Sequence, residues 1–338
     1  MTDQRLQLLL ERFPDLSMLV VGDFFLDEYL ITDPQLTESS LETGLDAYQV
    51  VERRCSPGAA GTVTNNLRAL GVGNIHALSM IGADGNGYEL RKGLIESGVD
   101  TTALVETSER FTPTYTKPTV RIGQSSEREL NRLDIKNRTP VPVDIEEKII
   151  RHLRNIVPEM DGVIVSDQVQ ERNFGVITDR VRSEICRLAV EYSEKTILID
   201  SRVRIGEFRS VIIKPNIHEA MDAVPDDDGG TMDISHAELL GSTLYQRTGE
   251  PVYVTLSEKG ILVVTEAGTS HLPAVQITGE IDPVGAGDST AAGITAALCA
   301  GAESVEAAVL GNRVAAIVVK QLGTTGTATP QQILQQRI

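Results

Sequence analysis

Short apolar runs alternate along this chain with segments in which apolar residues recur every three or four positions. The apolar runs lie at 17–22, 75–81, 162–165, 196–199, 211–213, 251–255 and 260–265. The segments of helical period lie at about 4–12, 57–70, 88–97, 144–156, 173–193, 233–248, 287–300 and 303–321. Continuous apolar runs are typical of strands buried on both faces, and their alternation with helices predicts a mostly parallel sheet covered on both sides.

Two segments depart from this pattern and predict a separate small sheet. Residues 28–55 are polar and rich in turn formers, with short β-prone pieces between them. Residues 112–122 alternate Thr, Tyr and Val with period 2, as a half-exposed strand does. We therefore predict one αβα domain over 1–338, with a small β-lid formed from about 28–55 and 110–124. The acidic stretch at 226–230 is predicted to be a surface loop.

The composition and charge of the chain indicate which kinds of partner it can bind. The formal net charge is −17, from 31 basic and 48 acidic residues, and such a surface disfavours nucleic acid and anionic membranes. No apolar run approaches the roughly 20 residues of a membrane span, and the first residues lack a signal-peptide pattern. The three cysteines are Cys55, Cys186 and Cys299, with no CxxC pair. We expect a cytoplasmic protein with a small-molecule substrate.

The segment most suggestive of chemistry is Asp282-Pro-Val-Gly-Ala-Gly-Asp288, which precedes a helix of small residues. Gly285 and Gly287 let the backbone turn sharply, so free amides of a helix N-terminus point outward and favour an anion. A carboxylate at Asp288 can accept a proton from an attacking hydroxyl. The same turn also suits an ordinary helix start, in which Asp288 only complements the helix dipole. This segment alone does not decide between the two interpretations.

Several other classes of protein lack their sequence signals in this chain. There is no GxxxxGK[ST] loop of the P-loop NTPases, and no GxGxxG follows the first apolar run. Only five histidines are present, and no Ser/His/Asp hydrolase pattern is found.

Asp282–Asp288 resembles the C-terminal signature of the ribokinase/PfkB carbohydrate kinases. Four further segments resemble that family in order and spacing, and they lie at 20–29, 57–71, 214–219 and 254–260. The resemblance covers about residues 17–330. It implies a ribokinase-like αβα sandwich with a small β-lid, and ATP-dependent transfer of a phosphoryl group to a sugar hydroxyl.

The resemblance also implies roles for individual residues. Asp288 would be the catalytic base, and the amides of Gly285, Ala286 and Gly287 would hold the developing charge. The residues implied to contact the sugar are Asp27, Asp23, Gly58, Asn66 and Lys117, although Asp23 and Asn66 also suit structural roles. The residues implied for ATP are Lys214, Asn216, Ser257, Gly260 and Asn312. Asn216 and Glu219 would organise Mg²⁺, and Asp282 with the Gly323 loop would form a K⁺ site. The basic residues considered for a substrate phosphate are Lys117, Arg121, Arg202 and Lys214.

Within the family, the chain looks closest to the kinase module of bifunctional heptose-phosphate kinase/nucleotidyltransferases. Shared features include Gly22-Asp23, Thr116-Lys117 and Arg132-Leu-Asp134. Three departures fall on the acceptor side. Gly58-Ala-Ala-Gly-Thr62 replaces the usual Gly-Gly-Ala-Ala-Asn, an Arg-Ile-Ser-Pro-Glu lid segment is absent near 35–45, and residues 166–171 lack the usual lysine. The resemblance thus predicts the reaction and leaves the acceptor open between a sugar and a sugar phosphate.

Alternatives of other classes remain at this point. A nucleoside kinase or a ribose- or fructose-type kinase would share the same motifs. A non-catalytic sugar- or nucleotide-binding regulator would be favoured by loss of Asp288 or its glycine turn, and both are present. In relatives the lid strands pair between subunits, which implies a homodimer.

Overall fold

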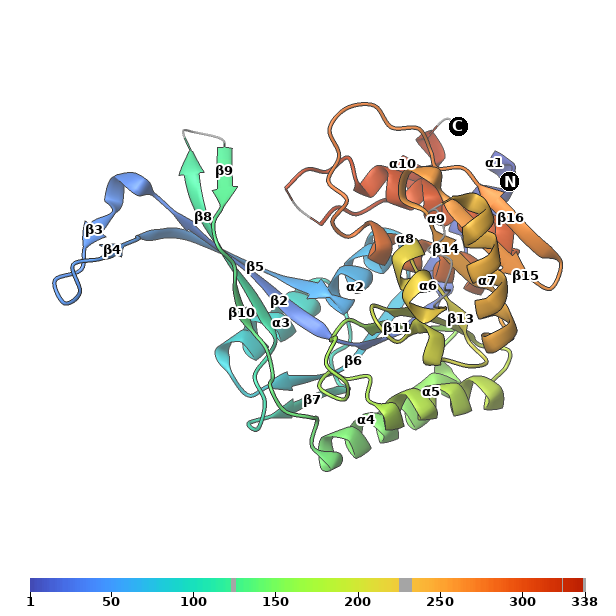
Figure 1. Ribbon diagram of the computed structural model, residues 1–338, viewed down its shortest axis with the longest axis horizontal. Coiled ribbons are helices and arrows are strands. Elements are labelled where there is room, and N and C mark those ends of the chain that lie inside the picture. Colours follow the sequence, from blue (N-terminus) through green and yellow to red (C-terminus); the bar gives the residue numbers. More distant parts are fainter. Residues whose placement is uncertain (123–125, 225–232, 324, 337–338) are drawn as a thin grey trace.

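The structure describes residues 1–122, 126–224, 233–323 and 325–336. At its centre is a nine-stranded sheet in the order β16-β15-β14-β13-β12-β11-β1-β6-β7 (Figure 1). This computed structural model gives the strands as β1 (Ser17–Gly22), β6 (Asn74–Gly82), β7 (Leu104–Thr107), β11 (Gly162–Asp167), β12 (Thr196–Ser201), β13 (Ile212–Ile213), β14 (Val252–Thr255), β15 (Ile261–Thr265) and β16 (Gly268–Leu272). All pairs from β14 to β7 are parallel, and β15 and β16 add an antiparallel edge. The predicted loop at 226–230 lies outside the described residues.

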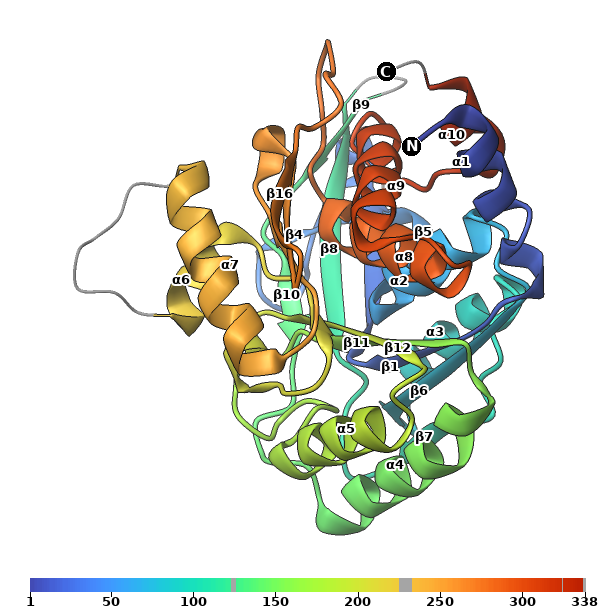
Figure 2. The ribbon, with the colours of Figure 1, turned by 90° about the vertical axis from the view of Figure 1, so that its right-hand side faces the viewer.

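Helices cover both faces of this sheet (Figure 2). One face packs against α1 (Asp3–Leu10), α2 (Ala60–Ala69), α3 (Gly85–Glu96), α8 (Ala286–Cys299), α9 (Ser304–Val318) and α10 (Pro330–Gln335). The other packs against α4 (Val143–Ile156), α5 (Asp179–Glu191), α6 (Ile217–Ala223) and α7 (Ile234–Thr248). Side chains alternate between these two cores, as Val20 and Val21 of β1 do. The predicted αβα architecture is confirmed.

A smaller sheet projects from the body as the lid (Figure 1). Its order is β10-β8-β2-β5, built from β2 (Phe24–Thr32), β5 (Val50–Ala59), β8 (Thr114–Ile122) and β10 (Leu133–Ile135), and β9 (Ser126–Glu129) pairs with β8. A short ladder of β3 (Glu38–Ser39) and β4 (Asp46–Ala47) lies at its far end. The expected lid segments are therefore found in this sheet. It also extends to β9 and β10, farther along the chain than predicted.

The structure corrects the prediction of a helix that begins at Pro57. The chain remains in β5 through this segment, where Pro57 pairs with Leu26 and Gly58 with Phe25. It turns at Ala59, whose φ is 52°, and α2 begins at the next residue. Pairing with β2 outweighs the local turn signal, and β5 is the edge strand of the lid, where proline is tolerated.

Other differences concern the ends of elements. The helix predicted over 173–193 spans only Asp179–Glu191, because the Thr178 side chain accepts a hydrogen bond from the Val181 amide and caps its start. Short elements that carry little periodicity, such as α6, α10 and β16, were not predicted. No helix in the described segments is both long and apolar enough to span a membrane.

Candidate active site

A cavity of about 720 Å³ opens where the parallel strands end. Ligands of open α/β sheets bind at this edge, because loops and helix N-termini converge there. Its polar wall comes from the end of β12, the segment before α6 and the start of α8, and consists of Asp200, Arg202, Lys214, Asn216, Glu219 and Asp288. Six residues from three separate parts of the chain thus share one space.

Asp288 lies in the first turn of α8, which begins after Gly285 with φ 80°. Burial raises the pKa of Asp288 to about 7, and the Asp200 carboxylate adds to this rise. The Lys214 ammonium opposes the rise without cancelling it. A carboxylate with such a pKa is suited to accept a proton near neutral pH.

The backbone amides of the predicted anion site differ in whether they already donate a hydrogen bond. The Ala286 amide donates to the Pro283 carbonyl at 3.1 Å, so it is already engaged in this conformation. The amide of Gly287 lies one residue further into α8, where a helix leaves its N–H groups without intrahelical partners. Gly287, rather than Ala286, is therefore the available donor of this turn.

A buried ion pair lies beside that turn. The Lys214 ammonium is 3.1 Å from Asp200 Oδ2, and the two side chains are 3% and 11% exposed. Burial opposes the charge of Lys214, but the carboxylates of Asp200 and Glu219 outweigh it and raise the pKa. A Cβ on Gly287 would lie 3.7 Å from Lys214 Nζ, so the ammonium faces the start of α8. The Lys214 ammonium and the Gly287 amide are thus two donors that face one space, and such donors suit a phosphate oxygen.

Asp200 is a member of the site that sequence reasoning missed. It directly follows the predicted strand at 196–199 and so stands at the carboxyl end of a buried parallel strand. That position alone was a usable signal, because functional side chains of open α/β sheets gather there.

Asn216 and Glu219 form a reciprocal cap at the start of α6. Asn216 Oδ1 accepts from the Glu219 amide at 2.9 Å, and Glu219 Oε2 accepts from the Asn216 amide at 2.8 Å. Burial raises the pKa of Glu219, and Asp200 adds to it. Each group keeps unused lone pairs on oxygen, which suits Mg²⁺ with retained waters. Among the described residues, no group of three or more His, Cys, Asp or Glu side chains is placed to hold a metal.

The opposite end of the cavity has an apolar wall. Gly260 has φ 96°, and a Cβ there would lie 2.0 Å from the Leu272 carbonyl oxygen. Asn312 Nδ2 donates to the carbonyls of Leu272 at 3.3 Å and Pro273 at 3.2 Å. These contacts hold the wall formed by Ala274, Val275, Ile277, Ile281, Ala316 and Val319. All five residues predicted for ATP, including Ser257, line this one cavity.

On the lid side, Asp27 of β2 pairs with Lys117 of β8. Asp27 Oδ1 is 3.2 Å from Lys117 Nζ, which also donates to the Tyr29 hydroxyl at 3.0 Å. Burial opposes the charge of Lys117, but Asp27 and Tyr29 raise its pKa. A Cβ on Gly58 would lie 2.6 Å from Asp27 Oδ2, so the carboxylate needs glycine at that position. The charge of Asp27 also raises the pKa of Asp288, so the two carboxylates lie within electrostatic range of each other, although Asp27 does not line the cavity.

Asp23 and Asn66 have different surroundings from the other predicted sugar contacts. The Asp23 carboxylate accepts hydrogen bonds of 2.8–2.9 Å from the amides of Gln168, Val169 and Val176, and thus anchors the loop after β11. Burial raises the pKa of Asp23 to about 6, and Asp167 adds to it. Asn66 is fully buried in α2, donates to the Thr62 carbonyl at 2.9 Å and does not line the active-site cavity.

The proposed partners of Asp282 do meet in space. Asp282 Oδ1 accepts from the Val284 amide at 3.0 Å, and Oδ2 accepts from the Gly323 amide at 3.3 Å. The predicted K⁺ site thus has its two segments together, and cation binding there stays a prediction.

Of the four basic residues considered for a substrate phosphate, three are paired. Arg121 donates to Glu52 at 2.9 Å on the lid surface, and Lys117 and Lys214 have the partners given above. The Arg202 guanidinium has no hydrogen bond or ion pair within the described part of the chain. It lines the active-site cavity close enough to Asp288 to lower the pKa of that carboxyl.

The sequence matches the pfkB family of carbohydrate kinases over residues 26–332. Because this match covers most of the chain, the protein belongs to that family, as the motifs predicted. The chain is also similar to two proteins named bifunctional protein HldE. It is 31% identical to the one from Trichlorobacter lovleyi over 336 residues, and 31% identical to the one from Citrifermentans bemidjiense over 330 residues. Each comparison covers 96% of this chain and 64% of the relative, so the chain spans less than two thirds of their length.

Solved structures agree on the fold. Phosphofructokinase-2 from Escherichia coli in complex with fructose-6-phosphate aligns with a TM-score of 0.69 and 15% identity, over 94% of this chain and 97% of that one. Ribokinase from Arabidopsis thaliana complexed with ribose and ATP aligns with a TM-score of 0.66 and 16% identity, over 95% and 99%. The ribokinase-like fold predicted from the sequence is confirmed.

The raised pKa of Asp288 has a consequence for stability. A carboxyl whose pKa is about 7 when folded and about 3.9 when unfolded contributes stability at low pH that is lost as the pH rises toward 7. Asp288→Asn should therefore unfold at a higher temperature than the unchanged protein at pH 8, with the gap narrowing toward pH 5. Thermal unfolding followed by circular dichroism measures this. The control is Asp144→Asn on the exposed face of α4, and lower stability of Asp288→Asn at pH 8 would contradict the assignment.

Proposed function

We propose that this protein transfers the γ-phosphoryl group of ATP to a hydroxyl of a sugar or sugar phosphate. The observation that carries the proposal is that Asp288 lines the same cavity as Lys214 and the apolar wall, while the charge of Asp27 in the lid acts on it. A nucleotide in this cavity and a hydroxyl acceptor beside the lid would both reach this carboxylate.

The chemistry follows from the groups that surround Asp288. Its carboxylate takes the proton of the acceptor hydroxyl, and the acceptor oxygen forms a bond to the γ-phosphorus. The bond from the γ-phosphorus to the bridging oxygen breaks, and ADP leaves with that oxygen and the bonding electrons. The Lys214 ammonium and the Gly287 amide stabilise the negative charge on the transferring group. Asn216 and Glu219 would hold Mg²⁺ through water, and this ion neutralises phosphate charge when bound.

The lid supplies the acceptor side. A carboxylate accepts two hydrogen bonds at a fixed spacing, so Asp27 suits a pair of sugar hydroxyls. Its contacts with Lys117 hold it in place before the sugar binds. A lid over the site also excludes water, which would otherwise compete with the sugar for the phosphoryl group. The resemblance to heptose-phosphate kinases supports a heptose-phosphate-like acceptor as one member of the panel below.

We further propose a homodimer that forms through the lid, with K⁺ as an additional cation at Asp282. The dimer is supported by large apolar side chains exposed on the lid, among them Val50, Val51, Ile122 and Leu133. Large apolar side chains left exposed on one sheet are a feature of association surfaces. Dependence on ATP and three cysteines without disulfide bonds fit a cytoplasmic protein.

The proposed reaction is tested by ADP release with ATP, Mg²⁺ and K⁺ across a panel of sugars, sugar phosphates and nucleosides. We expect acceptor-dependent ADP formation that falls by roughly 10²-fold or more in Asp288→Asn, the typical effect of removing a general base. Asp144→Asn on α4 is the matched control and should keep full activity. ATP binding without acceptor-dependent turnover over the whole panel would favour a non-catalytic regulator, and turnover restricted to nucleosides would favour a nucleoside kinase.

Gly58→Ala tests the acceptor role of Asp27 separately. The added methyl group displaces the Asp27 carboxylate from its place beside Lys117, so the KM of the acceptor should rise roughly tenfold, the loss of one charge-assisted hydrogen bond. The KM of ATP should not change. Gly85→Ala is the matched control, because no atom lies within 4 Å of a Cβ at that position. An acceptor KM that is equal in the two variants would remove Asp27 from the acceptor site.

A further inference from the structure

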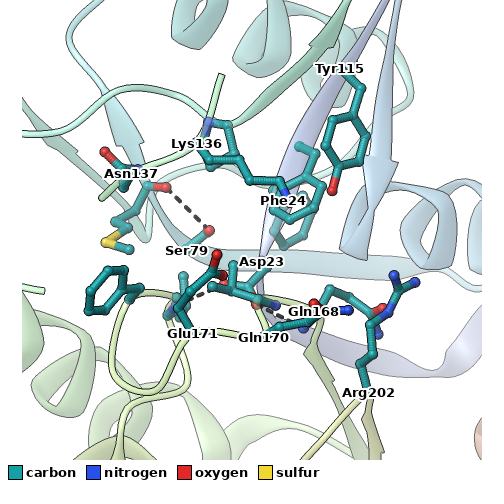
Figure 3. Close-up of a pocket in the computed structure, with 17 residues that line it drawn as sticks. Asp23, Phe24, Ser79, Tyr115, Lys136, Asn137, Gln168, Gln170, Glu171 and Arg202 are labelled. Atoms are coloured by element: carbon teal, nitrogen blue, oxygen red, sulfur yellow. Dashed lines mark hydrogen bonds between the residues drawn. The ribbon is translucent and has the colours of Figure 1, made fainter. Parts of the chain in front are cut away.

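A second cavity of about 50 Å³ adjoins the active site beneath the base of the lid (Figure 3). Its walls come from the ends of β1, β6 and β11, from the start of β2 and β8, and from the segment after β10. Gln168 and Arg202 line this cavity and the larger one, so the two spaces adjoin at these residues. A substituent of a ligand bound at Asp288 would enter the smaller cavity past these two side chains.

One part of the wall is apolar. Phe24, Phe25, Met80 and Phe174 line it, and the ring of Phe25 meets Tyr115 edge-on with 5.2 Å between ring centroids. Apolar and aromatic walls favour a methyl or methylene group over a hydrated one.

Uncharged polar groups line another part. The side chains of Gln168 and Gln170 have no hydrogen bond within the described residues, so both carboxamides are available to a ligand. Ser79 is different, because its hydroxyl donates to the Gly22 carbonyl at 2.7 Å. Figure 3 shows Gln168, Gln170 and Glu171 on the side opposite Tyr115 and Lys136.

The charged residues of the wall balance. They are Asp23 and Glu171 against Lys136 and Arg202, so their formal charges sum to zero. Asp23 is 3% exposed, and three backbone amides donate hydrogen bonds to its carboxylate. A phosphate placed here would meet one buried negative charge and gain no net attraction from the wall.

The size of the cavity limits what it can hold. The cavity volume is about 50 Å³. One water-sized sphere needs about 10–15 Å³, so the cavity admits roughly four heavy atoms. Tyr115 also pairs across the lid strands with Asp27. A sugar ring that bonds to Asp27 and offers a hydroxyl to Asp288 would thus direct a neighbouring substituent past Tyr115 into this space.

We propose that this cavity binds a compact, uncharged, amphipathic substituent of the acceptor, and that the acceptor is an N-acylated amino sugar. An acetamido group has four heavy atoms, a methyl group for the aromatic wall, and an N–H and a C=O for the two carboxamides. This inference rests on the proposed kinase function and specifies the acceptor of that same site.

The test compares matched pairs of acceptors in the ADP-release assay. N-acetylglucosamine, N-acetylmannosamine and N-acetylgalactosamine are each measured against the parent hexose, the free amino sugar and the 6-phosphate of the parent. We expect kcat/KM at least tenfold higher for the N-acetyl member of at least one pair. Equal values within every pair would overturn the subsite while leaving the kinase proposal intact, and a larger gain for the phosphate would make the cavity an anion site.

Calorimetric binding of the same pairs to Asp288→Asn separates this inference from the proposed reaction. Tighter binding of an N-acetyl sugar without turnover would support the subsite even where the kinase assignment fails. Equal binding within every pair, together with no turnover of any acceptor by the unchanged protein, would contradict both.

Val169→Phe tests the location of the subsite. Val169 is half-buried and lines only the smaller of the two cavities, so a phenyl ring there fills the space. The tenfold preference for the N-acetyl sugar over the parent hexose, both measured on the same variant, should fall to about one. Val190→Phe, at an exposed position of α5, is the matched control. If Val169→Phe does not fold, Val169→Leu replaces it and should lose part of the preference for the N-acetyl sugar. A folded variant that keeps the full preference would contradict the location of the subsite.

Discussion

The site depends on a surplus of negative charge at the end of the central sheet, where Asp200 is buried and Glu219 and Asp288 are half-buried. Asp200, Glu219 and Asp288 share this region with one buried cation, Lys214. An isolated buried carboxylate would simply take up a proton, and a buried charge is tolerated only when it is paired or hydrogen-bonded. Lys214 pairs with Asp200 at 3.1 Å, and this leaves Asp288 with a pKa near neutrality and with no ion pair of its own among the described residues. The arrangement keeps a base ready and a cation fixed beside it.

The lid is joined directly to the central sheet, and this junction fixes the lid relative to the carboxylates of the site. β2 follows β1 after a single residue, and Gly22 at the junction has φ 147°. A Cβ there would lie 2.1 Å from the Ser166 carbonyl oxygen, so only glycine allows β1 and β11 to approach so closely. Asp23, the next residue, ties the loop after β11 to the same point. The acceptor side is thereby anchored directly to the central sheet.

Much of this organisation was predictable because it follows from local pattern. Buried strands that alternate with amphipathic helices predicted the αβα layers, and the Gly-Ala-Gly-Asp turn predicted a helix start that carries Asp288. The remainder depends on which segments meet. Pro57 and Gly58 carry turn signals, yet they lie in a strand because β2 pairs with them. Asn66 is a plausible sugar ligand in sequence, but its place on α2 directs it into the core. The smaller cavity requires six segments to converge, and no spacing along the chain encodes that.

The central claim is that burial and neighbouring charges set Asp288 to act as a base near neutral pH. The most direct test is the pH dependence of kcat/KM for the acceptor, measured at saturating ATP from pH 5.5 to 9 and repeated with Lys214→Met. The account predicts a rate that rises with pH to a plateau with a half-maximum near pH 7. It also predicts a half-maximum at higher pH in Lys214→Met, because loss of the cation raises the pKa of Asp288 further. A rate that is independent of pH over this range, or a half-maximum that moves to lower pH in the variant, would contradict it.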